Sequence, residues 1–131
     1  MTPLNFLLVF VGGGIGSVLR YLVSITALRL YGPHFPLGTL AVNVIGCATM
    51  GAIAAFAIWR GPGGTSETIR IFFMTGILGG FTTFSAFALD TMVLWERGDV
   101  VLAGAYVLIS VGVSLAVIAA TMAGTRMLLV G

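Results

Sequence analysis

The stretch GILGGFTTFSAFAL, from Gly76 to Leu89, interrupts an apolar segment at its own centre. It holds three glycines, two threonines and a serine among its phenylalanines. Glycines weaken a helix, and hydroxyl side chains can bind the backbone groups that a helix break frees. Such a break is tolerated in a membrane only where protein or a cavity surrounds it. The stretch therefore predicts a broken membrane helix, with the break running from the glycine pair at Gly79 to Thr83.

Composition places the whole chain in a membrane. Of its 131 residues, 59% are hydrophobic and 8% are charged, whereas a soluble domain has about a quarter of its residues charged. Uncharged runs predict four membrane helices, over residues 4–29, 37–59, 70–95 and 100–127. The linkers are too short to separate domains, so we expect one all-α integral membrane domain over residues 1–131. The six arginines are scattered, which argues against nucleic acid as a partner.

Charge is almost balanced between the two sides of the expected membrane. Four spans put both termini on one side, which receives Arg60, Arg70 and Arg126, while the other side receives Arg29 and Arg97. Orientation follows the side richer in lysine and arginine. Three against two is nearly no bias. The count fits a chain that inserts either way up, and equally a small protein whose few charges lack a bias by accident.

One arginine lies inside the first span. The apolar run continues past Arg20 to Leu28, so Arg20 is expected to lie deeper than a residue that snorkels to the membrane surface. Ionisable groups at depth usually face protein or water and mark function. Two roles stay open for Arg20: a positive vestibule for an anion, or a structural clamp on backbone carbonyls.

Glycines in the same span predict close helix packing. Gly12 and Gly16 are four residues apart and form a flat face that another helix can approach. A dinucleotide-binding glycine loop is excluded, because Ser17 stands at the third glycine and no acidic residue follows at the required distance.

Polar side chains in the second and fourth spans recur at four-residue steps, which places them on one helix face. Thr39 and Asn43 form such a pair, and Tyr106, Ser110 and Ser114 form a longer series. Hydroxyls in register either hold helices together or line a wet track. The amide of Asn43 likewise either joins helices or donates N–H groups into a pore.

Aromatic residues follow the expected break. Phe84 and Phe87 are three residues apart on one helix face. Such a pair usually serves packing, but the positive edge of an aromatic ring can also meet an anion.

No Asp or Glu lies deep in any expected span, since Asp90 is near the end of the third. A proton-coupled cation exporter needs a buried carboxylate, whereas donors and one arginine suit an anion.

Three motifs, GGGIGSVLRY, GTLAVNVIG and GILGGFTTFSAF, follow one another on the first three spans. Together they resemble the CrcB/Fluc family of bacterial fluoride channels over essentially the whole chain. The resemblance implies a passive fluoride-selective channel with no enzymatic step, in the bacterial cytoplasmic (inner) membrane. It also implies an antiparallel dual-topology homodimer in the lipid bilayer, with two pores lined by both subunits.

The resemblance also implies roles for individual residues. Arg20 is the arginine of the first-span motif, as a vestibule or structural residue. A structural Na⁺ ion at the dimer interface is implied on the backbone carbonyls of Gly79 and Thr82 from both subunits. The residues implied for the fluoride pore are Thr39, Asn43, Phe84, Ser85, Phe87, Tyr106, Ser110 and Ser114.

Two alternatives come from other functional classes. A small dual-topology multidrug exporter is disfavoured because the first span lacks a buried glutamate. A structural subunit of a larger membrane complex would leave the broken third span and the hydroxyl series without a role.

Overall fold

The computed structural model describes residues 1–63 and 65–131, and these residues form helices joined by short loops. The elements are α1 (Pro3–Tyr31), α2 (Leu37–Arg60), α3 (Thr65–Ile69), η1 (Arg70–Leu78), α4 (Gly79–Phe81), α5 (Phe84–Glu96) and α6 (Val100–Val130). Elements α3 to α5 follow one another along a third span, so four helical segments are long and apolar enough to cross a membrane. The prediction of four such helices is confirmed.

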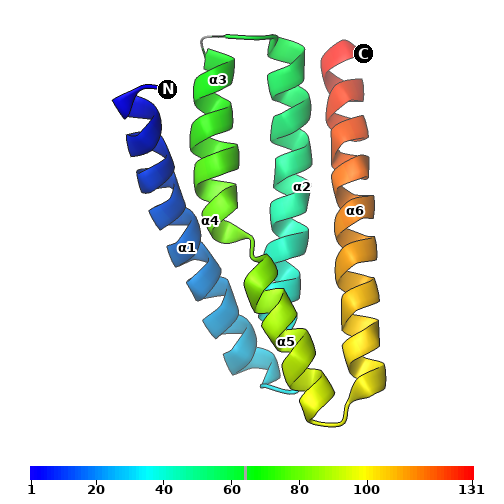
Figure 1. Cartoon of the computed structure of the whole chain (residues 1–131). Helices are drawn as coiled ribbons and strands as arrows, with labels where there is room; N and C mark the ends of the chain where they lie inside the picture. The colour runs from blue at the N-terminus through cyan, green and yellow to red at the C-terminus, as the bar shows by residue number, and fades with distance from the viewer. Residues whose placement is uncertain (64) are drawn as a thin grey trace.

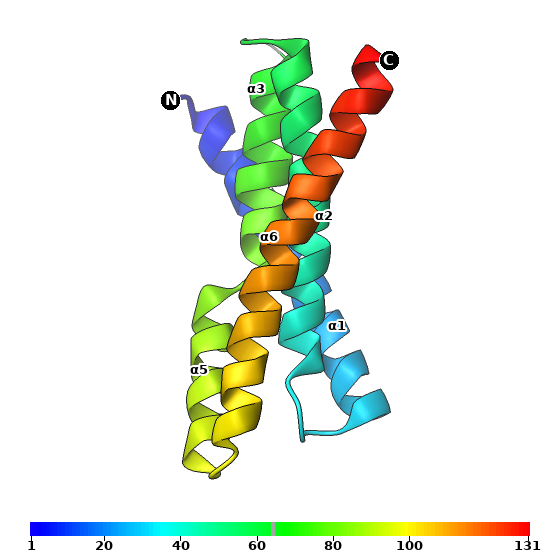
Figure 2. The same cartoon turned by 90° about the vertical axis from the view of Figure 1, so that its right-hand side faces the viewer.

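The four spans form one bundle with both termini at the same end (Figure 1). Helix α2 lies against α6, and α1 lies against η1 and α4 (Figures 1 and 2). Helix α5 leans away from the axis of the first half of its span and packs on the first turns of α6 (Figures 1 and 2). The half of the third span that carries the aromatic pair therefore meets the helix that carries the hydroxyl series.

Glycines bring α1 into backbone contact with the third span, as predicted. A Cβ atom on Gly12 would lie 2.7 Å from the carbonyl oxygen of Phe72, and one on Gly16 would lie 2.8 Å from the backbone nitrogen of Phe81. Real Cβ atoms essentially never come this close to other heavy atoms. Small residues at a membrane helix interface act in this way, by letting the two backbones approach.

Alanine at position 16 is expected to destabilise the protein. The added methyl group would collide with the carbonyl of Ile77 and with the backbone of Phe81, neither of which moves without shifting a helix. Overpacking of this kind costs about 1–3 kcal/mol. The matched control is Gly14→Ala, which meets nothing within 4 Å and gains up to about 1 kcal/mol of helix propensity. Thermal unfolding in detergent measures both variants, and equal unfolding temperatures for them would contradict the close contact.

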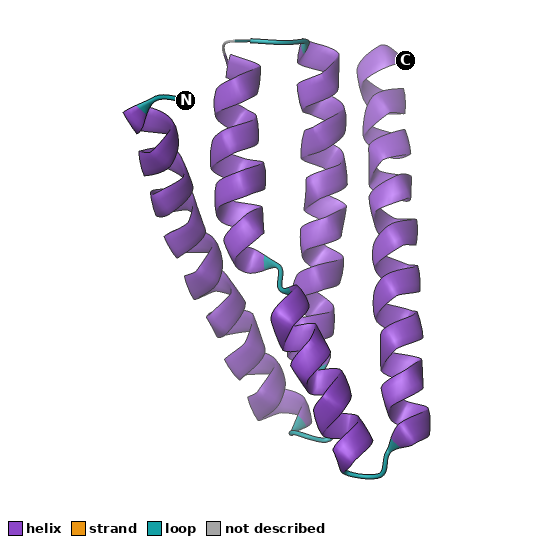
Figure 3. Cartoon of the chain, in the orientation of Figure 1, coloured by secondary structure: helices purple, strands orange, loops and turns teal. Residues whose placement is uncertain are grey.

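The third span departs from α-helical geometry at two places. Residues Arg70–Leu78 wind as a π-helix, a form that is rare in long runs and frequent at functional sites. The chain then becomes extended at Thr82, with φ −82° and ψ 158°, and at Thr83, with φ −152° and ψ 124°. Figure 3 shows this interruption as a short loop between two helices. It lies at the middle of the span Ser66–Glu96, so the prediction of a broken third helix is confirmed.

The position of the break corrects one detail of the sequence prediction. Gly79 and Gly80 are still helical, and the break comes at the two threonines that follow them. Gly80 has another use, because a Cβ atom there would collide with the carbonyl of Gly13 on α1. The glycine pair therefore serves helix contact, and the extended backbone of the threonines makes the break.

Candidate functional site

Asn43 ties the break to α2 by two hydrogen bonds. Its Nδ2 donates to the carbonyl of Thr83 at 2.9 Å, and its Oδ1 accepts from the backbone N–H of Thr83 at 2.8 Å. The Thr83 hydroxyl accepts from the N–H of Ala86 at 3.1 Å and so caps α5. Asn43 therefore joins two spans, which is one of the two roles that the sequence left open. A primary amide has a second N–H donor on the same nitrogen.

The same contacts free two backbone carbonyls. In a continuous α-helix the carbonyl of Gly79 accepts from Thr83, and the carbonyl of Thr82 accepts from Ala86. Here the N–H of Thr83 bonds to Asn43, and the N–H of Ala86 bonds to the hydroxyl of Thr83. Both carbonyls thus lose their usual helical donor. Unwound carbonyls at a broken membrane helix are the groups that coordinate cations.

A groove of about 310 Å³ opens beside the break, between α2, α5 and α6. Thr82, Thr83 and Cys47 line it, and none of these had been assigned to a pore. Five of the residues predicted to form a pore line it as well: Asn43, Phe84, Phe87, Ser110 and Ser114. The structure therefore gathers most of the predicted pore residues, from three separate spans, around one space.

Ser110 is the most informative residue of the groove. Its side chain is 5% exposed, and its Oγ has no hydrogen-bond partner among the described residues. A buried hydroxyl without a partner costs about 1–3 kcal/mol. Such a group points to an occupant of the groove that accepts or donates a hydrogen bond. Ser110 favours the wet-track interpretation of the hydroxyl series over simple helix contact.

Aromatic rings form a row at the edge of the groove. Phe84 is 79% exposed, and its ring centroid lies 5.6 Å from that of Phe87. Phe87 in turn lies 5.3 Å from the ring of Tyr106. Phe84 and Phe87 both line the groove, and the edges of such rings carry positive partial charge.

The profile of the family described as "CrcB-like protein, Camphor Resistance (CrcB)" matches residues 7–124. The chain belongs to the CrcB family. A relative from Rhizobium etli, named "Fluoride-specific ion channel FluC", is 53% identical over 122 residues, which cover 93% of this chain and 96% of the relative. A protein of the same name from Paracoccus denitrificans is 55% identical over 116 residues, covering 88% of this chain and 90% of its own. The CrcB match includes every residue of the groove.

Three of the predicted pore residues lie outside the groove of this CrcB chain. The Tyr106 side chain is completely buried and donates from its hydroxyl to Asp90 Oδ2 at 3.2 Å. Thr39 lies beside that hydroxyl. Ser85 is exposed, and its Oγ is 3.3 Å from the hydroxyl of Thr83. Tyr106 and Thr39 therefore continue the polar series beyond the groove, while Ser85 supports the break.

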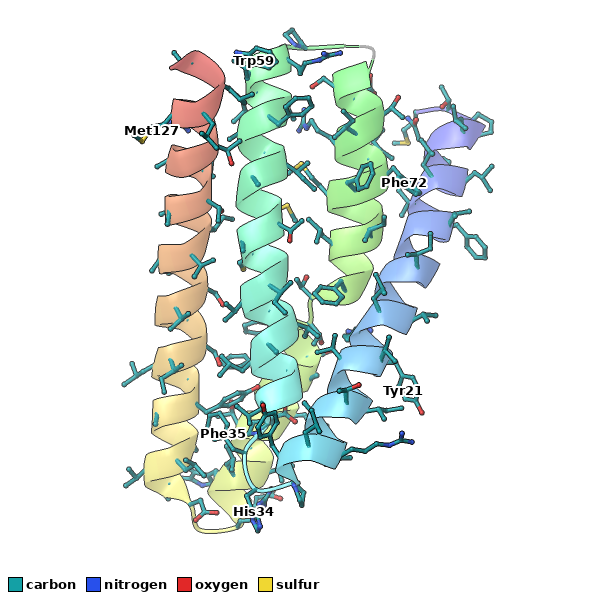
Figure 4. All side chains as sticks on the ribbon, turned by 180° about the vertical axis from the view of Figure 1, so that it is seen from behind. Tyr21, His34, Phe35, Trp59, Phe72 and Met127 are labelled. Carbon is teal, nitrogen blue, oxygen red and sulfur yellow. The ribbon has the colours of Figure 1, made fainter. Side chains whose placement is uncertain are left out.

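Asp90 is a polar residue for which the sequence predicts a place near the end of the third span and no role. In the structure it pairs with Tyr106 and lines a second cavity of about 260 Å³, with Thr39 and Arg97. Phe35, which packs edge-on against Tyr106 at 5.5 Å, lies at the same end of the bundle (Figure 4). A signal was present, because Asp90 follows Phe87 by three residues and shares its helix face.

Arg20 is not brought to the groove. It is half-buried on α1, and it does not line the groove. Among the described residues it makes no hydrogen bond to a carbonyl and no ion pair, so the described contacts do not favour the clamp. The vestibule role of Arg20 stays a prediction.

Proposed function

We propose that this chain is the subunit of a fluoride-selective channel that lets fluoride leave the cell passively across the bacterial cytoplasmic membrane. The observation that carries the proposal is the groove with the hydroxyl of Ser110, which has no hydrogen-bond partner among the described residues. Two further observations support it: membership of the CrcB family, and relatives about half identical to this chain that are named fluoride-specific ion channels. A channel of this kind moves an ion without chemical change, so the chain is not an enzyme.

The groove offers an anion several weak donors. The donors are the hydroxyls of Ser110 and Ser114, the second amide N–H of Asn43, and the ring edges of Phe84 and Phe87. Conduction requires binding that is favourable enough to admit the ion and weak enough, over several sites, to release it. Neutral donors meet both needs, whereas a full positive charge in the groove would hold the ion. Neutral hydrogen fluoride enters a cell and dissociates there, so a passive outward path is sufficient for resistance.

The channel is proposed to be an antiparallel, dual-topology homodimer in the lipid bilayer. One chain leaves the groove open on one side, with Phe84 79% exposed at its edge. A second copy, inserted the other way up, would close the groove with its own apolar surface. The nearly even distribution of arginines between the two ends supports insertion in both orientations.

A structural Na⁺ ion is proposed at the dimer interface. The residues fit this ion, because the break frees the carbonyls of Gly79 and Thr82 from their helical donors, and unwound carbonyls coordinate Na⁺ in broken membrane helices. The ion would supply a fixed positive charge that joins carbonyls of the two chains.

Removal of sodium is expected to weaken the dimer. Purification and dialysis in a large organic cation should lower the unfolding temperature and increase the monomer fraction on size exclusion, and added Na⁺ should restore both. A dimer equally stable after exhaustive exchange of Na⁺, verified by elemental analysis, would contradict the site.

Growth in fluoride tests the proposed function. Cells that lack their own fluoride exporter should survive millimolar-range fluoride when they express this chain and should fail when they carry an empty vector. Immunoblots of membranes confirm equal expression. Failure to rescue, with the protein present in the membrane, would count against fluoride export and would reopen the structural-subunit alternative. Rescue from toxic organic cations instead would favour the multidrug exporter.

A further inference from the structure

The polar series on α2 extends one step beyond the two residues predicted from the sequence. Thr39 and Asn43 are four residues apart, and Cys47 follows at the same step. Cys47 is a free, half-buried thiol that lines the groove together with Asn43. A column of three polar side chains therefore runs along the face of α2 that meets α6.

The register of α2 and α6 places this column opposite the hydroxyl series. Thr39 lies beside Tyr106, and Gly51 lies against the carbonyl of Ile118. In both pairs the two partners are 67 residues apart along the chain. Because α2 and α6 run in the same direction with the same rise per residue, residues between these two contacts are paired at the same separation.

The same separation pairs Asn43 with Ser110 and Cys47 with Ser114. All four residues line the groove, which agrees with this register. Cys47 therefore lies one helical turn beyond Asn43, at the level of Ser114, in the direction of the chain termini.

A second observation points to a ligand in this groove. The side chain of Ser110 is 5% exposed, lines the same groove, and has an Oγ without a partner among the described residues. Cys47 is thus a half-buried thiol that shares its groove with an unpartnered hydroxyl.

We propose that Cys47 is a binding site for thiophilic metal cations in the wall of the anion path, and that a bound metal blocks fluoride export. The blocking half of this proposal rests on the proposed function. Soft thiolate ligands select soft metals, and the class of ligand is a small cation that forms linear thiolate complexes, such as an organomercurial.

The reaction with methylmercury chloride is a simple exchange. The S–H bond of Cys47 and the Hg–Cl bond break, and an S–Hg bond forms. The proton goes to water or buffer and chloride leaves, with no change in oxidation state. The reagent is small and neutral, so it can enter the groove along the path that the ion takes. The product fills space between α2 and α6 that an ion would need.

The test uses the full chain in fluoride-loaded liposomes, treated with methylmercury chloride and then assayed for efflux and for mass. We expect one methylmercury group per chain, because Cys47 is the sole cysteine of the sequence, and about a tenfold or larger loss of fluoride efflux through the narrowed path. Excess dithiothreitol should remove the group and restore efflux. Cys47→Ala should gain no mass, and the efflux that it retains should be the same before and after treatment.

A matched control moves the thiol out of the groove. Leu108→Cys in the Cys47→Ala background places it on α6 at a residue that is 75% exposed and does not line the groove. This variant should gain the mass of one methylmercury group and keep its efflux.

The outcomes separate this site from the proposed function. Fluoride efflux absent from the untreated protein would contradict the channel, and the mass measurement alone would then decide whether Cys47 binds the metal. Normal efflux with no adduct on Cys47 would overturn the metal site. If the fully modified protein keeps normal fluoride efflux, or if the reagent inhibits Cys47→Ala as strongly as the original protein, Cys47 does not lie in the path.

Discussion

Replacing Phe84 and Phe87 together by isoleucine is expected to reduce fluoride efflux about thirtyfold. If each ring edge holds the ion by about 1 kcal/mol, the order that aromatic pairs reach, the loss of two amounts to about 2 kcal/mol, which corresponds to that factor. Isoleucine keeps an apolar side chain at the groove but has no ring edge. The measurement is the initial rate of fluoride efflux from liposomes that contain equal amounts of protein.

A second aromatic pair provides the control for this experiment. Phe72 and Phe73 lie on η1 with ring centroids 5.0 Å apart, and neither lines the groove. Phe72 lies in the half of the bundle nearer the termini (Figure 4). The same double change to isoleucine there should leave efflux within a few-fold of the original protein. If the groove variant conducts as well as this control, the rings of Phe84 and Phe87 do not line the path.

Asn43→Ala is expected to lower both stability and efflux. The change removes both hydrogen bonds to Thr83 and leaves its N–H and carbonyl unpaired beside the break. Each unpaired buried group costs about 1–3 kcal/mol, so a decrease of about 2–6 kcal/mol is expected. Asn43→Asp keeps an acceptor for the N–H of Thr83 but sets a carboxylate against its carbonyl, so it should retain part of the stability and lose efflux.

The control for Asn43 is a polar residue on the same helix with a purely local bond. Thr49 donates from its hydroxyl to the carbonyl of Ile45 at 2.9 Å, within α2. Thr49→Ala should change the unfolding temperature little, because the backbone keeps its own hydrogen bonds. Equal stabilities of the Asn43→Ala and Thr49→Ala variants would show that the tie between α2 and the break is unimportant.

The four spans follow from the sequence because lipid imposes one requirement on every span: about 20 apolar residues whose backbone groups bond within the segment. Uncharged runs in the sequence are therefore enough to predict the spans, and no information about neighbouring helices is needed. The contact face of Gly12 and Gly16 is similarly local, since both residues lie on one turn of α1.

The break is harder to place because its determinants lie on other spans. Gly80 would break an isolated helix, but α1 uses it for a backbone contact with Gly13. The actual break depends on Asn43, which is 40 residues from Thr83 in the chain. The π-helical winding of Arg70–Leu78 has no such local signal at all.

Polar residues that recur at regular helical steps predict most of the site. The predicted set is incomplete because it omits the next residue at each of two such steps. The step from Thr39 to Asn43 leads to Cys47, and the step from Phe84 to Phe87 leads to Asp90. What no periodicity predicts is that the Ser110 hydroxyl has no partner in the part of the chain that the structure describes, because this depends on the packing of three spans around one hydroxyl.

Selective efflux of fluoride is the most direct measurement of the central claim. The purified chain is reconstituted in liposomes loaded with fluoride or with chloride, and efflux is followed with an electrode selective for each ion. Fluoride should leave liposomes that contain the protein rapidly, whereas liposomes without protein should retain it. Chloride should leave no faster than from liposomes without protein. Chloride efflux as fast as that of fluoride, or fluoride retained by liposomes that contain folded protein, would contradict a fluoride-selective path through this chain.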